Sequence, residues 1–257
     1  MSNHNGDAAD DARRAWLWQL VREEAAAEGV AVGTRHLCVV ATSVLGASAV
    51  IVYQVVDGVR SEPVAVSGPT ADQVSEAEVT FGEGPAVDAL RDEYPVLVAD
   101  LRSGSAGERW PVFAPFALTH GVFSVSAYPV MMGAIVVGCL EVYRDVAGAA
   151  TPGQIVDGLL LADAAMLLLL RAGPSGVGED PFADAVEVRW ATVHQATGVA
   201  SVQLRSDLAT AFVRLRAHAY RTGTRLADVA ADVLAHRLMF HTDLDDEPDT
   251  ESESEQG

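Results

Sequence analysis

Lysine is missing from this chain of 257 residues, so its 17 basic residues are all arginines. Cysteine is nearly missing as well. Cys38 and Cys139 are the only two, and both lie in apolar runs, which excludes a disulfide-rich scaffold and predicts unreactive core thiols. Aromatic residues are few, at 6%, yet apolar residues reach 49% and charged residues 21%. That balance is typical of a globular protein and excludes a wholly disordered chain.

No apolar run is long enough to cross a bilayer. The most apolar stretch, residues 155–170, contains Asp157 and Asp163, whereas a membrane span needs about 20 apolar residues. The first eleven residues are polar and acidic, where a signal peptide would carry a basic segment. We therefore expect a cytoplasmic protein with no membrane partner.

Positive charge is scarce in a chain of net charge −19, and it is unevenly distributed. Residues 1–181 contain 10 Arg against 23 Asp and Glu, and residues 242–257 contain 8 acids and no base. Residues 182–241 differ, with 7 Arg against 5 acids. Only this middle segment is therefore suited to a phosphate backbone. Arginine favours that role because its planar guanidinium binds phosphate through two hydrogen bonds.

Residues 12–171 are predicted to form one α+β domain of the sensor type, preceded by a disordered tail at 1–11. Alternating apolar patterns predict antiparallel strands, and helical patterns flank them. A turn at Asp57–Gly58 joins the first two strands, and residues 102–108 are expected to form a loop. The strands are expected at 49–56, 61–67, 96–100, 122–130 and 134–143, and the helices at 12–28, 34–45, 70–78, 111–119 and 152–171.

Three Gly and two Pro among residues 172–181 predict a linker. Beyond it, helices are expected at 182–204, 207–222 and 225–240, with Ser206 and Thr224 as N-caps and Gly223 as a C-terminal stop. Residues 242–257 form an acidic tail of low complexity, which predicts disorder. Helical spacing on the second of these helices predicts a core stripe of Leu208, Phe212, Leu215 and Ala219.

Three motifs follow one another in the helical segment: VHQATGVASVQL at 193–204, AFVRLRAHAY at 211–220 and LADVAADVLAHRL at 226–238. Their alanine-rich helices, aromatic positions and order resemble ANTAR domains, the three-helix RNA-binding modules of bacterial antiterminators. Upstream, FGEGPAVDAL at 81–90, RWPVF at 109–113 and GAIVVGCLEVY at 133–143 resemble GAF domains. The pair is similar to actinobacterial GAF–ANTAR regulators, which implies a GAF sensor domain at 12–171 and an ANTAR domain at 182–241.

Polar side chains on the second helix of this module point to RNA. Arg214, His218 and Arg221 lie at i, i+4 and i+7 and define one face, suited to phosphate and to unpaired bases. The alternatives are a solvated helix face for the arginines and close helix packing for Gln195, Thr197 and Gly198. The predicted RNA-binding residues are Gln195, Thr197, Arg205, Arg214, Arg216, His218, Tyr220, Arg221 and Arg225.

Patterns for catalysis or metal binding are not recognisable. The histidines of the helical segment form no i, i+4 pair, and the chain has no nucleophile elbow, clustered cysteines or carboxylate pair of recognisable spacing. The loop FGEGP at 81–85 opens a helix and suits an anion, but we prefer a structural turn because Glu83 would repel phosphate. We expect no enzyme, no cofactor and no metal, and leave open an unknown small-molecule ligand of the GAF domain.

The resemblance implies a signal-responsive regulator that acts by transcription antitermination, binding hairpins in a leader RNA so that a terminator does not form. Paired hairpins imply a homodimer. An apolar seam for it is offered by the helix at 152–171, unless these residues pack on their own sheet: Ile155, Leu159, Ala162, Met166 and Leu169. The acidic tail is expected to compete with RNA for the arginine face. The alternative function is a ligand-sensing GAF regulator that acts through protein partners, with a degenerate ANTAR segment.

Overall fold

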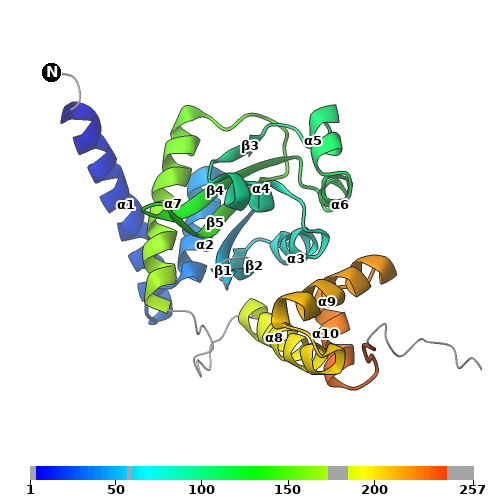
Figure 1. Cartoon of the computed structure of the whole chain (residues 1–257). Coiled ribbons are helices and arrows are strands. Elements are labelled where there is room, and N and C mark those ends of the chain that lie inside the picture. The colour runs from blue at the N-terminus through cyan, green and yellow to red at the C-terminus, as the bar shows by residue number, and fades with distance from the viewer. Residues whose placement is uncertain (1–3, 57–59, 173–184, 242–257) are drawn as a thin grey trace, which may run out of the picture. The chain divides into compact units, whose positions relative to one another are not determined.

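The computed structural model describes residues 4–56, 60–172 and 185–241, and the chain divides into two compact units, Met1–Ala191 and Thr192–Gly257 (Figure 1). The first unit is an α+β domain. Its helices are α1 (His4–Glu28), α2 (Thr34–Leu45), α3 (Ala71–Phe81), α4 (Pro85–Asp92), α5 (Gly104–Arg109), α6 (Phe113–Thr119) and α7 (Pro152–Ala172). Its strands are β1 (Ala49–Val56), β2 (Arg60–Ser67), β3 (Val96–Val98), β4 (Ser124–Met132) and β5 (Ile135–Arg144).

The five strands form one antiparallel sheet in the order β2-β1-β5-β4-β3, which confirms the predicted α+β class. Side chains alternate between the two faces of the sheet, as strand geometry requires. In the central pair, Val52 lies opposite Leu140 and Tyr53 lies opposite Cys139. All four are buried, because helices cover both faces of the sheet here. β-Branched and aromatic residues suit such a site, since they fill a pleated surface that is covered on both sides.

The hydrophobic core lies between the sheet and helices α2 and α7, with α1 packed outside them (Figure 1). Leu140 of β5, Leu37 of α2, Leu161 of α7 and Leu17 of α1 all belong to this one cluster. Helices α3 and α4 lie against the opposite face of the sheet. The sheet is therefore covered by helices on both faces, with α1 outside α2 and α7, and each face of the sheet has its own set of buried side chains.

The predicted N-terminal disorder is wrong from residue 4 onward, since residues 4–28 form α1. Acidic residues near a helix N-terminus interact favourably with the helix dipole. Two ion pairs also hold the helix: Arg14 lies 3.3 Å from Asp11 one turn before it, and Arg13 donates two hydrogen bonds of 2.7 Å to Asp157 of α7. The composition of residues 1–11 alone does not indicate this contact between α1 and α7.

The predicted loop at 102–108 is also wrong, because residues 104–109 form α5. Ser103 caps this short helix, its side chain accepting a hydrogen bond from the backbone N–H of Ala106. At the hairpin after β4, Met131 and Met132, which lie beyond the predicted strand 122–130, extend the strand and pair with Val136 and Ile135. The turn Asp57–Gly58 lies outside the described residues.

Helix α7 is a core helix. It is the one described helix that is long and apolar enough to cross a membrane by length and composition, and half of the qualifying stretch is buried inside the domain. Of the predicted dimer seam, Ala162 and Leu169 are buried and Ile155 and Met166 pack against the core, so the packing alternative holds for these four. The exposed apolar side chains of α7 are Val156, Leu159, Leu167 and Leu170.

Three helices follow: α8 (Ala185–Leu204), α9 (Leu208–Thr222) and α10 (Leu226–Leu234), as predicted in number and order. Their caps differ from the prediction. Asp207, not Ser206, caps α9, its carboxylate accepting a 2.6 Å hydrogen bond from the backbone N–H of Thr210. Arg225 is the N-cap residue of α10 and makes no side-chain cap bond. Gly223 is confirmed as the stop of α9, with φ 65°.

The last helix is shorter than predicted and ends at Leu234 rather than at residue 240. His236, two residues later, adopts φ 57°, a conformation that does not continue a helix. Of the predicted linker 172–181, Ala172 closes α7 and the other residues lie outside the described part of the chain, as do residues 182–184 and the predicted acidic tail.

Candidate RNA-binding surface

The C-terminal unit packs around a small apolar core rich in alanine, which lets helices approach closely. Phe212 and Leu215 of α9 are buried as predicted, but Leu208 is 50% exposed. Leu208 is the first residue of α9, one turn before the part of the helix that meets its neighbours. The buried apolar side chains of residues 192–241 are Val193, Ala196, Ala200, Leu204, Ala211, Phe212, Leu215, Ala219, Leu226, Val229, Ala230 and Val233.

Helix α9 carries Arg214, His218 and Arg221 on one face, and two of them are in contact. The Arg221 guanidinium nitrogen lies 3.3 Å from Nδ1 of His218. The His218 ring meets Phe240 edge to face, with 5.8 Å between ring centroids. Phe240 is fixed in turn, since its backbone N–H donates a 3.0 Å hydrogen bond to Gln203 of α8. The imidazole is thus held between an arginine and an aromatic ring.

Arg216 is set apart from the other arginines of α9. Its guanidinium lies over the Phe212 ring, 5.8 Å from the centroid. Burial lowers the pKa of Arg216, although an arginine remains charged at any physiological pH. The side chain covers apolar core with its stem, so removing it disturbs packing as well as charge.

Arg221, Arg205, Arg225 and Gln195 are exposed, and so is Tyr220, at 54%. Arg205 connects α8 to α9 with φ 49°, a left-handed conformation that glycine adopts without cost and an arginine does not. This conformation ends α8, where the backbone N–H of Ser206 donates a 3.0 Å hydrogen bond to the carbonyl of Ser201, as is common at helix C-termini. These five side chains reach solvent from α8, from α9 and from the two connections.

Thr197 is the exception among the predicted site residues. It is buried, and its hydroxyl donates a 2.7 Å hydrogen bond to the backbone carbonyl of Val193. The packing alternative therefore fits Thr197, which does not belong to the candidate RNA-binding surface. The same alternative does not fit Gly198, because a Cβ added there would meet no atom within 4 Å.

Two features of this unit are not among the predicted site residues. Arg237 adds a further exposed guanidinium, held by Asp232 with a contact of 2.6 Å. Val213 and Val202 are exposed apolar side chains, at 57% and 78%. The number of arginines in residues 182–241 pointed to Arg237, but valine on a helix surface gives no polar signal.

In the N-terminal unit, the glycine-rich loop is a structural turn, as preferred. Glu83 accepts hydrogen bonds from the backbone N–H groups of Val112 and Phe113, at 2.6 and 2.8 Å, and so holds the start of α6. Glu78 of α3 accepts a 2.7 Å hydrogen bond from the N–H of Ala86 at the start of α4. A carboxylate of the chain therefore occupies the helix N-terminus at which an anion would bind.

Within the described residues, no group of three or more His, Cys, Asp or Glu side chains is arranged to hold a metal ion. Cys38 and Cys139 are buried and neither forms a disulfide, as predicted for core thiols. Burial raises the pKa of the Cys139 thiol well above its ordinary value, which makes it a poor nucleophile.

Comparison with known proteins identifies the C-terminal unit. Residues 184–234 match the ANTAR domain, and this match covers α8, α9 and α10 almost from end to end. ANTAR domains are an RNA-binding family of antitermination modules. No curated protein matches the chain.

Solved structures resemble the N-terminal unit at low identity. The GAF domain of a phosphoenolpyruvate-protein phosphotransferase from Acinetobacter is 16% identical, with a TM-score of 0.49, over 68% of this chain and 99% of that one. A GAF domain of the same kind of enzyme from Coxiella burnetii is 16% identical, with a TM-score of 0.47, over 63% and 98%. A type II free methionine-R-sulfoxide reductase from Thermoplasma acidophilum is also 16% identical, with a TM-score of 0.43, over 54% and 90%.

The predicted fold class is confirmed: an α+β GAF-like domain with a five-stranded antiparallel sheet, followed by a three-helix ANTAR region.

Proposed function

We propose that this protein is a cytoplasmic, signal-responsive regulator that binds leader-RNA hairpins through residues 192–241 and acts by transcription antitermination. The observation that carries the proposal is the polar face of α9. Arg214, His218 and Arg221 lie together on this helix, inside the segment that matches the ANTAR domain. In a chain of net charge −19, the excess of 7 Arg over 5 acids in residues 182–241 makes this segment the part best suited to an anionic partner.

The side chains divide the work of RNA recognition. Arg214, Arg221 and Arg205 contact phosphates, which gives affinity that falls with salt. Tyr220 stacks on an unpaired base of a hairpin loop, a mode that single-stranded loops allow and paired stems do not. His218, Gln195, Arg216 and Arg225 complete the surface. Specificity for loops therefore rests on Tyr220 and its polar neighbours, and affinity rests on the arginines.

Two modules acting on two hairpins require a dimer. The exposed apolar residues Val156, Leu159 and Leu170 of α7 supply a contact surface for it, in place of the buried part of the seam. The N-terminal domain senses a ligand or partner of unknown identity and changes how RNA is bound.

The experiment is RNA binding by the full-length protein to a leader with paired hairpins, against a control of equal length with scrambled loops, at two salt concentrations. We expect loop-dependent binding that weakens at the higher salt. Equal affinity for both RNAs contradicts the proposal, since it would leave only a non-specific charge effect.

A second candidate is a regulator that acts through protein partners. The exposed side chains of Val202, Val213 and Leu208 favour it, because apolar groups on one small module suit a protein interface. Substituting Val202 and Val213 by serine separates the two functions. Under the first proposal the double variant retains both RNA affinity and regulation, whereas loss of regulation with unchanged RNA binding favours the second.

A further inference from the structure

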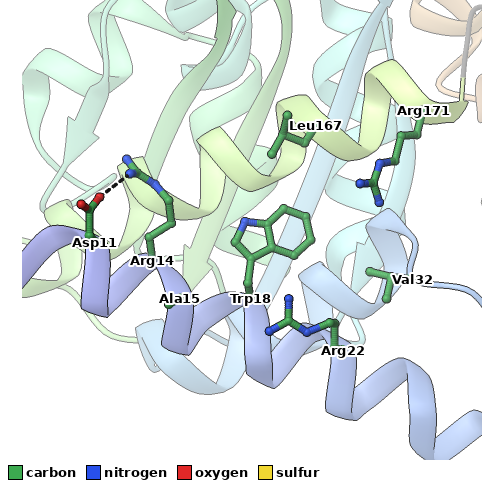
Figure 2. A pocket seen from close by; sticks show the side chains of 8 residues that line it. All are labelled: Asp11, Arg14, Ala15, Trp18, Arg22, Val32, Leu167 and Arg171. Carbon is green, nitrogen blue, oxygen red and sulfur yellow. Dashed lines mark hydrogen bonds and ion pairs between the residues drawn. The ribbon is translucent and has the colours of Figure 1, made fainter.

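A hollow of about 540 Å³ lies on the outer side of α1 and α7, away from the sheet (Figure 2). Small-ligand and peptide sites commonly enclose 300–1,000 Å³, roughly, so this one has room for a few residues of chain. It lies wholly within the N-terminal unit, and the ANTAR match does not include it. The lining residues are Asp11, Arg14, Ala15, Trp18, Arg22, Val32, Leu167 and Arg171.

The floor of the hollow is apolar and partly aromatic. Trp18 packs against the core of the domain and also lines the hollow, together with Leu167, above it in Figure 2, and Val32, to its right. Leu167 is one of the exposed apolar residues of α7. An aliphatic side chain that bound here would pack against the indole and the two branched side chains. Burying this apolar surface away from water favours binding.

The rim of the hollow carries positive charge in excess. Three arginines line it against one acid, Asp11, and that acid already pairs with Arg14 at 3.3 Å. Arg14 also contacts Asp163, at 3.4 Å. Arg22 and Arg171 have no carboxylate partner among the described residues. Figure 2 shows both guanidinium groups on the same side of the hollow, beyond the Trp18 ring. The hollow is therefore complementary in charge to a ligand that carries carboxylates beside an apolar group.

We propose that this hollow, rather than the arginine face of α9 expected from the sequence, binds the acidic C-terminal segment, residues 242–257, of a second copy of the chain. The segment contains 8 acids and no base, and its single aliphatic residue, Leu244, stands between Asp243 and Asp245. The sequence thus offers one apolar side chain for Trp18 and a carboxylate on each side for Arg22 and Arg171. Guanidinium–carboxylate pairs of this kind are strong because both groups are charged and the geometry allows two parallel hydrogen bonds.

Binding of the acidic segment to the hollow is most favourable when the two belong to different copies of the chain. Two chains of net charge −19 repel one another, and an acidic segment seated on a basic hollow offsets part of that repulsion. The second copy is that of the proposed dimer, so this inference rests in part on the proposed function. Binding of the segment to the hollow can nevertheless be measured without RNA and without dimerisation.

The test uses a labelled peptide with the sequence of residues 242–257 and the chain that lacks those residues. Two double variants of equal charge change are compared, Arg22→Gln with Arg171→Gln and, as the matched control, Arg214→Gln with Arg221→Gln. We expect the first pair to weaken peptide binding at least about tenfold and the second to leave it unchanged. A peptide with Leu244→Ser is expected to bind a few-fold more weakly.

Three results overturn the proposal: no binding of the peptide, equal loss in both double variants, or loss only with Arg214 and Arg221 replaced. The last result would make the ANTAR surface the acceptor. If the Arg22 and Arg171 variant loses RNA affinity instead of peptide affinity, the occupant is RNA.

Sedimentation then tests whether the segment comes from a second copy of the chain. Full-length protein is expected to associate more tightly than the shortened chain, and the Arg22 and Arg171 variant is expected to match the shortened chain. If the peptide binds but the full-length and shortened chains associate equally, the segment does not join two copies, and the second-copy assignment is overturned.

Discussion

Glu78 and Glu141 share one hydrogen-bond donor: the hydroxyl of Tyr53 lies 3.0 Å from Oε2 of each carboxyl group. The hydroxyl of Tyr143 lies 2.8 Å from the same oxygen of Glu141 and 3.4 Å from that of Glu78. Both carboxyl groups are buried, on α3 and on β5. Oε1 of Glu141 has no hydrogen-bond partner in the described structure. Two ionised carboxylates cannot be held here by two phenol protons, so the pair retains a proton of its own.

This shared proton makes the N-terminal unit sensitive to pH. Burial raises the pKa of Glu141, and burial together with the nearby charge of Glu141 raises the pKa of Glu78 well above its usual range. The other groups that face the pair are Tyr53, Tyr143 and Cys139, whose pKa values burial also raises. All three are neutral near pH 7, so none of them compensates a second carboxylate charge.

The first prediction concerns Glu141→Gln. In the folded chain the pair binds more protons than in the unfolded chain at any pH between the unfolded Glu pKa of 4.5 and its raised folded value. The free energy of unfolding therefore falls as pH rises through that window. Glutamine removes one titrating group, and its amide can donate to Glu78. We expect the variant to lose less stability than the parent between pH 5 and pH 9, roughly, by chemical denaturation. Parallel pH profiles for the two proteins would contradict the shared proton.

A second prediction concerns the turn between α3 and α4. Gly84 adopts φ 148°, and a Cβ added there would lie 2.2 Å from the carboxylate of Glu78. Gly84→Ala is therefore expected to destabilise the N-terminal unit by about 1–3 kcal/mol and to loosen the cap on α4. Gly153→Ala is the control, since a Cβ at Gly153 in the first turn of α7 meets no atom within 4 Å. Hydrogen exchange of the peptides covering α4 measures the difference, and equal exchange in both variants would refute it.

The third prediction compares two glycines of the C-terminal unit. Gly223 ends α9 with φ 65°, whereas Gly198 lies inside α8 with open space around it. Gly223→Ala should cost about 1 kcal/mol, because alanine is strained in the left-handed region. Gly198→Ala should stabilise α8 by about 0.5–1 kcal/mol through its higher helix propensity. The two substitutions are chemically identical, so a change of the same sign in thermal unfolding of the module would show that its backbone is described wrongly.

A fourth prediction exploits the backbone of Arg205. Its φ of 49° suits glycine, so Arg205→Gly is expected to stabilise the unit by about 0.5–1 kcal/mol. The same change removes a guanidinium from the proposed RNA surface and should weaken RNA binding, most clearly at low salt. Arg205→Gln serves as the control that removes the charge and keeps the strain. If glycine stabilises the module and RNA affinity does not fall, Arg205 is no phosphate contact.

Sequence patterns predicted most helices and strands of this fold because their signals are local. Strand β1 and helix α2 begin and end where the patterns indicated, since alternation and helical periodicity repeat within a few residues. Helix α1 shows the limit. Residues 4–11 look like a polar tail on their own, and their helix depends on α7, where Asp157 binds Arg13. Contacts across the chain override local composition.

The candidate sites divide in the same way. The Arg214, His218 and Arg221 face of α9 follows from helical spacing and was predictable. The burial of Thr197 was not, because its hydroxyl is satisfied within its own helix. The pair of Glu78 and Glu141 was missed altogether: 63 positions separate them, and only the packing of α3 against the sheet brings them to one phenol. No spacing rule connects residues that meet through tertiary structure.

The most direct test of the account is the salt dependence of leader-hairpin binding by the full-length protein and by two double variants. Arg214→Gln with Arg221→Gln is expected to lower affinity and to reduce the slope of log K against log salt by about 1.5–2. The reason is that binding releases roughly one counterion fewer for each phosphate contact that is lost. Arg35→Gln with Arg102→Gln makes the same change of charge on the surface of the N-terminal unit, away from both proposed binding surfaces, and is expected to leave the slope as it is. Equal slopes in all three proteins would contradict RNA binding by the α9 face.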